Sequence, residues 1–330
     1  MKRILLAGGA GFIGSALARE MLAEGHDILC LDALAGGNSE NIAGLEEHPR
    51  FRFIHGDIRN REGLTALFAA YQPDWVINLA TERQGERNCT GVEAVIGTNF
   101  HGASILMEEA LAYWHTADTP EDFRFLQVST SKVFGTRPAD APAADEHTPY
   151  RPQTPYAASK AAADHMAQAL FHSQGLPVLI ALPGHSFGPR QQAERFIPSV
   201  IARALSAEPL PLSANGGETR DWMHVNDQVS ALYAILRQGI PGSAYIIGAG
   251  RAMRNRDLAE RICDLLDTRP ETPDADPRHS LFSSPDDGTG PGCALDPSRL
   301  ARDLGWRPSH DFDEALKETV DWFLANRPVK

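Results

Sequence analysis

The chain has 330 residues, of which 42% are hydrophobic and 22% charged, so it can bury a substantial core and does not have the composition of a disordered protein. Its net charge of −12 excludes nucleic acid and an anionic membrane surface as the main partner. The four cysteines lie far apart without a C-x-x-C pair, which favours reduced thiols. No apolar run reaches the ~20 residues of a membrane span, and the immediate start of a strand leaves no room for a signal peptide. We therefore expect a cytoplasmic protein with no membrane or nucleic-acid partner.

The first predicted elements are a buried strand over 4–7, a glycine turn, and an amphipathic helix that ends near residue 25. Gly8, Gly11 and Gly14 form a G-x-x-G-x-x-G pattern between that strand and that helix. The first glycine allows a tight turn, the second lets a pyrophosphate approach the backbone, and the third permits close packing. Phe12 and Ile13 then offer N–H groups at the positive end of the helix dipole. Because the pattern lies between a strand and a helix, it predicts a dinucleotide site.

Later strands supply further predicted cofactor contacts. Asp32 ends a strand over 27–31, at about the ~20-residue spacing expected after the glycines. Its carboxylate can accept hydrogen bonds from a ribose diol and would repel a 2′-phosphate, which favours NAD over NADP. Asp57 is placed to reach the adenine edge, and the other expected cofactor contacts are Ile58, Leu79, Ala80, Thr81 and Asn99. Strands that alternate with helices predict an α/β fold with a Rossmann-type, doubly wound parallel sheet.

The segment "TPYAASKAAADH" predicts a helix start with Thr154 as its cap and Pro155 in its first turn. Tyr156 and Lys160 are four residues apart and so share one face of that helix. A nearby ammonium and a cationic nicotinamide would both lower the pKa of the phenol, which makes Tyr156 a candidate base and both residues candidate cofactor contacts. Thr130 ends the preceding strand and is the expected hydroxyl partner of the substrate.

The chain resembles the extended short-chain dehydrogenase/reductase family, the NAD-dependent epimerases and dehydratases. Within it the chain is most similar to the dTDP-glucose 4,6-dehydratases. The motifs that carry the likeness are "GGAGFIGS", "LDALAGGN", "TNFHGASILMEEALAYW", "FRFLQVST", "TPYAASKAAADH", "RFIP", "TRDWMHVND" and "LGWRP". The resemblance implies a tightly held NAD that oxidises a sugar at C4 and later returns the hydride. It also implies that Tyr156 removes the C4 hydroxyl proton, that Lys160 supports it, and that Thr130 binds that hydroxyl.

One departure from the family lies in the hydroxyl cluster. The dehydratases carry an Asp-Glu pair where this chain has Ser131 and Lys132, so both catalytic carboxylates are missing. A neutral Lys132 could still remove the C5 proton if its surroundings lower its pKa. An epimerase that works through a 4-keto intermediate needs neither carboxylate. The sequence therefore leaves open a nucleotide-sugar 4,6-dehydratase of altered substrate range, an epimerase of a nucleotide-linked or less phosphorylated sugar, and a non-catalytic NAD-binding regulator.

A second departure concerns the substrate phosphates. An arginine-rich motif of the family aligns with "DDGTGPGC", residues 286–293, which contains no arginine and two aspartates. Such a segment would repel a diphosphate. Arg195 and Arg220 remain where the family has other phosphate-side contacts, and we expect Arg87 and Ser129 to contact the substrate as well. His185 is either a second acid/base group or a histidine that packs in its loop.

We expect two domains. The NAD-binding domain spans 1–182, with 221–249 packing back on it, and 183–220 with 250–330 form a smaller α/β substrate-binding lid. The segment 268–292, rich in Pro, Asp, Ser and Gly, is either an exposed lid loop or disordered. The histidines show no metal-ligand spacing, so no metal site is expected. The partner is a sugar that is nucleotide-linked, and the resemblance implies a homodimer.

Overall fold

The computed structural model describes residues 1–83, 91–116, 122–138, 140–210, 212, 216–269 and 292–326. Its large domain is built on a parallel sheet of seven strands in the order β3-β2-β1-β4-β5-β6-β9. The strands are β1 (Arg3–Ala7), β2 (Asp27–Asp32), β3 (Phe51–His55), β4 (Trp75–Asn78), β5 (Arg124–Val128), β6 (Val178–Pro183) and β9 (Ala244–Ile247). The order reverses at β1, which places a crevice at the carboxyl ends of β1 and β4.

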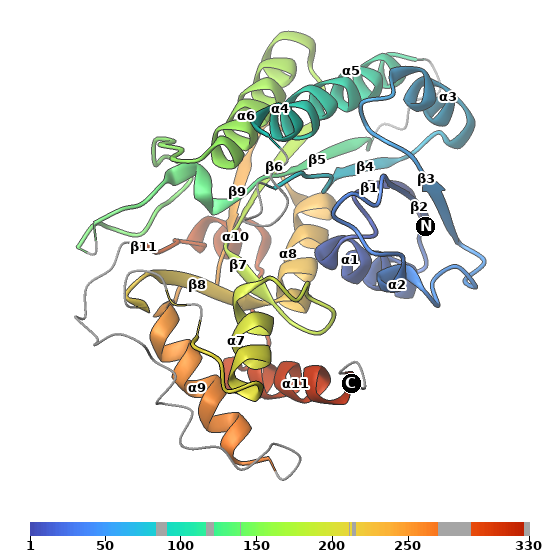
Figure 1. Ribbon diagram of the computed structural model, residues 1–330. Coiled ribbons are helices and arrows are strands. Elements are labelled where there is room, and N and C mark those ends of the chain that lie inside the picture. The colour runs from blue at the N-terminus through green and yellow to red at the C-terminus, as the bar shows by residue number, and fades with distance from the viewer. Residues whose placement is uncertain are drawn as a thin grey trace.

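Helices cover both faces of this sheet (Figure 1). One face packs against α3 (Arg61–Tyr71), α5 (Ala103–Trp114) and α6 (Pro155–Gln174), the other against α1 (Phe12–Ala23) and α8 (Val225–Gln238). The shorter elements are α2 (Ser39–Ile42), α4 (Val92–Ile96), the π-helix η1 (Gly97–Gly102) and the 3₁₀-helix η2 (Ser131–Phe134). In β1, Leu5 belongs to one hydrophobic core and Ile4 and Leu6 to the other, because side chains alternate along a strand. The predicted doubly wound parallel sheet is confirmed.

A smaller domain lies below the sheet in Figure 1, with a third hydrophobic core of its own. Its central strand β8 (Thr219–His224) pairs with β7 (His185–Phe187), β10 (Ala252–Arg254) and β11 (Gly292–Cys293). Three helices pack around them: α7 (Phe196–Leu205), α9 (Asn255–Asp267) and α11 (Phe312–Ala325). In the described part of the chain, no helix is long and apolar enough to span a membrane.

One helix lies outside the predicted domain division. We expected all of 250–330 in the substrate-binding lid, but α10 (Ser298–Leu304) packs against β9 and α8 of the large domain. Leu300 is fully buried in the core that those elements share. A seven-residue helix with one buried leucine has too weak a periodic pattern to show which core it joins.

Two of the connections between the domains, the one from β6 to β7 and the one from β9 to β10, lie beside Asp221 of β8. Gly184 is the single residue between β6 and β7, and a Cβ there would lie 3.0 Å from the Asp221 carbonyl oxygen. The loop from β9 to β10 donates N–H groups from Ala249 (2.7 Å) and Arg251 (3.1 Å) to the Asp221 carboxylate. Burial raises the pKa of this carboxyl to about 6, and these backbone donors oppose the rise.

Candidate active site

The glycine turn packs closely against neighbouring backbone. Gly8 has φ +81°, and a Cβ on it would lie 2.5 Å from the Ala80 nitrogen, so only glycine fits. A Cβ on Gly14 would lie 2.3 Å from the Gly8 oxygen, which fixes how closely α1 approaches the turn. Gly11 is the N-cap of α1 and has no side chain to cap it, so Phe12 and Ile13 begin a helix whose first N–H groups suit an anion.

Asp32 ends β2 beside this turn, as the sequence predicts, and its side chain is 8% exposed. Its carboxylate accepts N–H groups from Ala10 (2.9 Å) and Leu34 (2.8 Å), which hold it at the rim of the turn. Asp57 forms an ion pair with Arg59 at 2.6 Å. Ile58 is buried against Gly102. These residues, together with the glycine turn and the start of α1, are called the cofactor cradle below, and binding of a dinucleotide there stays a prediction.

Asn99 links the loop after β4 to α6 by hydrogen bonds. Its amide oxygen accepts from Thr81 (3.2 Å) and from the Glu82 N–H (2.7 Å), while its nitrogen donates to the Glu82 carbonyl and to Ser159. Asn99 lies in the π-helix η1, and π-helical turns often mark functional sites. Because these hydrogen bonds engage both ends of the buried amide, Asn99 holds Thr81 in place, and direct contact with a cofactor stays a prediction.

Tyr156 and Lys160 lie on the buried face of α6. The helix begins as predicted, with the Thr154 hydroxyl accepting the Ala157 N–H at 3.1 Å and Pro155 in the first turn. The Lys160 ammonium donates to the Val128 carbonyl at 2.8 Å, which ties it to the end of β5. Burial acts to raise the pKa of Tyr156, but Arg83, Lys160, Lys132 and a hydrogen bond with Thr81 outweigh it, so the pKa is lowered. A lower pKa makes the phenolate form easier to reach, and that phenolate can accept a proton from a substrate hydroxyl.

Arg83 is a site residue that the sequence analysis missed. Its guanidinium lies 5.1 Å from the centroid of the Tyr156 ring, and its charge acts on Tyr156, Lys160 and Lys132. The available signal was its position two residues after Thr81, at the end of the strand expected to pass the middle of the dinucleotide. No residue spacing shows that a side chain from this loop reaches α6.

The hydroxyl cluster follows β5. The Thr130 hydroxyl accepts the Lys132 N–H at 3.3 Å and caps η2, while Ser131 is buried in the first position of that helix. The Lys132 side chain is exposed, yet desolvation by the surrounding protein, then the charges of Arg83 and Arg220, lower its pKa. The hydroxyl of Ser129 donates to Asp164 at 2.5 Å, on the buried side of the strand. Contact between Ser129 and a substrate therefore stays a prediction.

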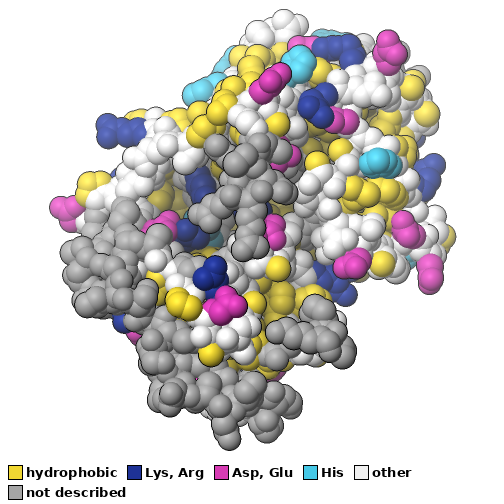
Figure 2. Space-filling view, viewed as in Figure 1, with side chains coloured by type: hydrophobic (Ala, Val, Ile, Leu, Met, Phe, Trp, Pro, Cys, Tyr) yellow, Lys and Arg dark blue, Asp and Glu magenta, His cyan; other side chains and the backbone are white. Residues whose placement is uncertain are grey.

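Cationic side chains of the small domain face this cluster. Burial, and then the charges of Arg220, Lys132, Arg83 and Arg195, lower the pKa of His185 well below its ordinary value. Burial also lowers the pKa of Arg195 to about 10, with Arg83 adding to the effect. Arg220 pairs with Glu218 through two hydrogen bonds of 3.1 and 2.9 Å. Basic side chains are visible where the two domains meet in the space-filling view (Figure 2). Arg87, and residues 286–291 of the segment without arginine, lie outside the described residues.

The comparisons with known proteins agree with this geometry. A family model described as GDP-mannose 4,6 dehydratase matches residues 5–319. The chain belongs to this family. A dTDP-glucose 4,6-dehydratase of Xanthomonas campestris pv. campestris (strain B100) is 40% identical over 328 residues, which are 98% of this chain and 93% of the relative.

Solved structures extend the likeness of this 4,6-dehydratase family member. A dTDP-glucose 4,6-dehydratase from Streptomyces venezuelae, crystallised with NAD, has a TM-score of 0.85 at 32% identity and covers 98% of both chains. A UDP-glucose 4-epimerase from Thermus thermophilus, in complex with NAD, has a TM-score of 0.82 at 28% identity and covers 98% of this chain and 100% of that one. The predicted membership of the extended short-chain dehydrogenase/reductases, and the likeness to dTDP-glucose 4,6-dehydratases, are confirmed.

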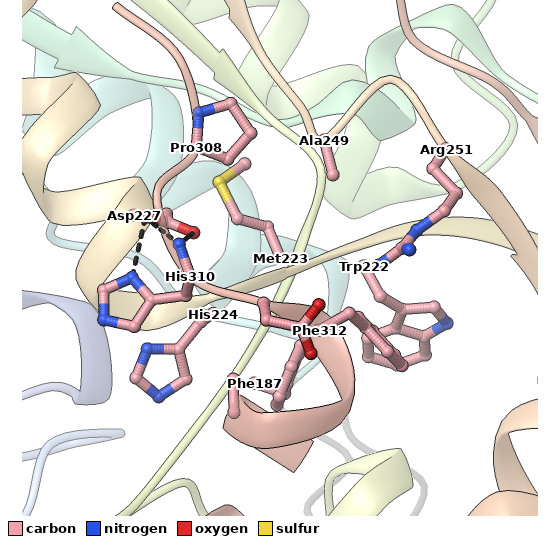
Figure 3. A pocket seen from close by; sticks show the side chains of 12 residues that line it. Phe187, Trp222, Met223, His224, Asp227, Ala249, Arg251, Pro308, His310 and Phe312 are labelled. Atoms are coloured by element: carbon pink, nitrogen blue, oxygen red, sulfur yellow. Dashed lines mark hydrogen bonds and ion pairs between the residues drawn. The ribbon is translucent and has the colours of Figure 1, made fainter.

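A separate cavity of about 250 Å³ lies between β8 and the start of α11 in this family member (Figure 3). None of the predicted site residues lines it. His224 is buried there with no hydrogen bond to either ring nitrogen among the described residues, and its ring centroid is 4.8 Å from that of His310. His310 in turn contacts Asp227 at 2.8 Å. Among the described residues no group of three or more His, Cys, Asp or Glu could hold a metal ion.

Proposed function

We propose that this protein is an NAD-dependent nucleotide-sugar 4,6-dehydratase that acts through transient oxidation at C4 and has an altered substrate range. The observation that carries the proposal is the pair Tyr156 and Lys160, buried on one face of α6 beside a cradle that fits a dinucleotide. Relatives that cover nearly the whole chain are named dTDP-glucose 4,6-dehydratases, and solved relatives were crystallised with NAD.

The residues present fit NAD, which supplies a hydride acceptor when it is bound. The glycine turn and the start of α1 bind its pyrophosphate, and Asp32 binds the adenosine ribose. The loop after β4, with Leu79, Ala80 and Thr81, would contact the middle of the dinucleotide. Tyr156 takes the proton from the C4 hydroxyl, and the positive charges of Lys160 and Arg83 stabilise the phenolate that does so. Thr130 orients that hydroxyl.

Lys132 is the residue we assign to the elimination that follows. Once C4 is a ketone, the C5 proton is acidic, and a base near C5 can remove it while the C6–O bond breaks. The ammonium that Lys132 becomes can then give its proton to the departing oxygen, which leaves as water. The pKa of Lys132 is lowered by its surroundings, which favours the neutral amine that this step requires. Ser131 can hydrogen-bond the departing hydroxyl but cannot protonate it as a carboxylic acid would, so we expect this elimination to be slower than in enzymes with two carboxylates.

The small domain holds the phosphate end of the substrate. Arg195 is the N-cap residue of α7 and Arg220 lies in β8, and both of their charges act on His185 of β7, as do those of Lys132 and Arg83. These cations converge in a protein whose net charge is −12, so the positive potential is local to the cleft. We therefore propose a nucleotide-linked substrate even though the segment 286–293 contributes no arginine.

Mass spectrometry tests the proposal. The purified protein is incubated in deuterated water with dTDP-, UDP- and CDP-glucose and with GDP-mannose. A product that has lost one water and carries deuterium at C5 supports a dehydratase, and Lys132→Met should then abolish the deuterium incorporation. No loss of water from any of the four sugars contradicts the proposal.

A specific observation favours an epimerase as the second candidate. Neither Ser131 nor Lys132 is a carboxylate, and a solved epimerase matches the fold at a TM-score of 0.82. An epimerase predicts a product of unchanged mass and no requirement for Lys132. A non-catalytic NAD-binding regulator is the third reading; it predicts that Tyr156→Phe leaves function intact, whereas either enzyme should lose roughly 10²–10⁴-fold in rate.

We also propose that the protein is a cytoplasmic homodimer. Val92 and Ile96 of α4 are each 46% exposed, which leaves an apolar edge on the helical layer that we expect to pair. Cys30, Cys263 and Cys293 form no disulfide, as suits a reducing compartment. Light scattering of the purified protein measures its oligomeric state, and a mass near that of one chain contradicts the homodimer.

A further inference from the structure

Asp164 places a carboxylate inside the protein, two helical turns beyond the catalytic tyrosine. Tyr156, Lys160 and Asp164 are spaced four residues apart and share one face of α6. The three residues are 8%, 2% and 1% exposed. A carboxylate this deep among apolar side chains is strongly unfavourable unless a cation or several donors compensate it.

Neutral donors compensate Asp164 only in part. One carboxylate oxygen accepts the hydroxyls of Ser129 at 2.5 Å and Tyr150 at 3.2 Å. The other oxygen is buried and has no hydrogen-bond partner among the described residues. Burial raises the pKa of Asp164 to about 7, and the Ser129 hydrogen bond, Lys160 and Tyr150 oppose that rise. Across β5, the loop before α6, and α6 itself, Lys160 is the one charged group found to act on Asp164 in the described part of the chain.

Lys160 needs an anion as much as Asp164 needs a cation. Its ammonium donates to the Val128 carbonyl. Burial lowers its pKa and Arg83 adds to that change, whereas the negative charges of Tyr156 and Asp164 oppose it. The charge on Tyr156 exists only while the phenol is deprotonated, and it disappears when Tyr156 takes up a proton. The Asp164 carboxylate does not depend on that step.

We propose that Asp164 is a positioning residue of the catalytic centre, the counter-ion that keeps Lys160 protonated and seated against Val128 in both protonation states of Tyr156. This role goes beyond the proposed function, which assigns nothing to Asp164. Because Lys160 must be an ammonium to stabilise the phenolate, Asp164 sets the upper pH limit of the site. Asp164→Asn keeps the shape and removes the charge, so Lys160 loses its proton at a lower pH. Residues four apart on a helix have Cβ atoms about 5–6 Å apart, and two unit charges at about that separation, at an effective dielectric constant near 20, give a shift of about two pH units.

A double-mutant cycle on stability tests the charge pairing without substrate or cofactor. The thermal midpoint is measured at pH 8 for the wild type, Asp164→Asn, Lys160→Met and the double variant. We expect Asp164→Asn to lower the midpoint in the wild type and to raise it in Lys160→Met, where the carboxylate has lost its cation. If Asp164→Asn changed the thermal midpoint in the same direction in the wild type and in Lys160→Met, the proposal would be overturned. Failure of the double variant to fold would also overturn it.

The pH dependence of NAD binding separates a charge effect from a structural one. Lys160 is a predicted NAD contact, so we expect NAD affinity to fall at alkaline pH when Lys160 loses its proton. Asp164→Asn should move this alkaline fall down by about two pH units. Tyr150→Phe is the matched control, because it removes a hydrogen bond to Asp164 and leaves the charge, so its alkaline limit should not move. Equal shifts in both variants would reduce Asp164 to a packing residue. A failed dehydratase assay leaves the stability cycle unaffected, so the two proposals can fail independently.

Discussion

Replacing Arg83 by glutamine should make Tyr156 a weaker acid. The guanidinium lies 5.1 Å from the ring centroid of Tyr156, and its positive charge lowers the pKa of the phenol. Two unit charges about 5 Å apart interact by about 0.8 kcal/mol in water and about 3 kcal/mol at an effective dielectric constant of 20. Arg83 is exposed, so an intermediate value near 1.4 kcal/mol applies, which is about one pKa unit.

The assay is an ultraviolet titration of the phenolate, with a Tyr156→Phe protein subtracted to isolate one tyrosine among six. Arg83→Gln should raise the midpoint by about one pH unit and lower kcat/KM about tenfold below that midpoint, with recovery at higher pH. Arg83→Lys retains the charge and serves as the control. An unchanged midpoint in Arg83→Gln would show that Arg83 does not tune the base, and would leave Lys160 and Lys132 as the cations that do.

Three further predictions concern the cofactor cradle and the buried histidine. Gly8→Ala places a Cβ 2.5 Å from the Ala80 nitrogen at φ +81°, so the free energy of unfolding should fall by at least about 1–2 kcal/mol and NAD binding should be lost; calorimetry that shows wild-type NAD affinity would contradict this. Asp32→Ala removes the acceptor of two backbone N–H groups, so the free energy of unfolding should fall by about 1–3 kcal/mol. The same variant should bind NAD more weakly and discriminate less against NADP, which titrations with the two cofactors measure. Burial, and then the charge of His310, lower the pKa of His224, so below pH ~6.5 the unfolded chain binds more protons than the folded one and stability falls as the pH drops. His224→Gln should therefore reduce the dependence of the free energy of unfolding on pH between ~6.5 and ~5, as measured by denaturant unfolding. An unchanged dependence would show that His224 does not cause it.

The parts of the site that the sequence predicts are those set by local spacing. The glycine turn, Asp32 at the end of β2 and the shared face of Tyr156 and Lys160 each follow from the geometry of one or two adjacent elements. Ser129 shows the limit of this reasoning. Consecutive residues of an extended strand point to opposite sides, so Ser129 and Thr130 do not face the same space, and the Ser129 hydroxyl is engaged with Asp164.

Contacts between residues far apart in the chain could not be predicted from the sequence. Arg83 reaches Tyr156 across 73 positions, and Asp164 is held by Ser129 and Tyr150 from outside its helix. The return of α10 to the large domain depends on which of two apolar surfaces offers room for Leu300. Such choices are decided by packing in three dimensions, and one chain's pattern of apolar residues contains no measure of it.

The cations on the two sides of the domain junction have an energetic consequence. Lys132 and Arg83 belong to the large domain, whereas Arg195 and Arg220 belong to the small one, and like charges on the two sides repel. This repulsion is a cost that the fold carries where the two domains meet, because among the described residues the cations there have few anions beside them. An anion placed among these side chains would relieve that cost, so the same charges that destabilise the protein alone would favour binding of an anionic ligand.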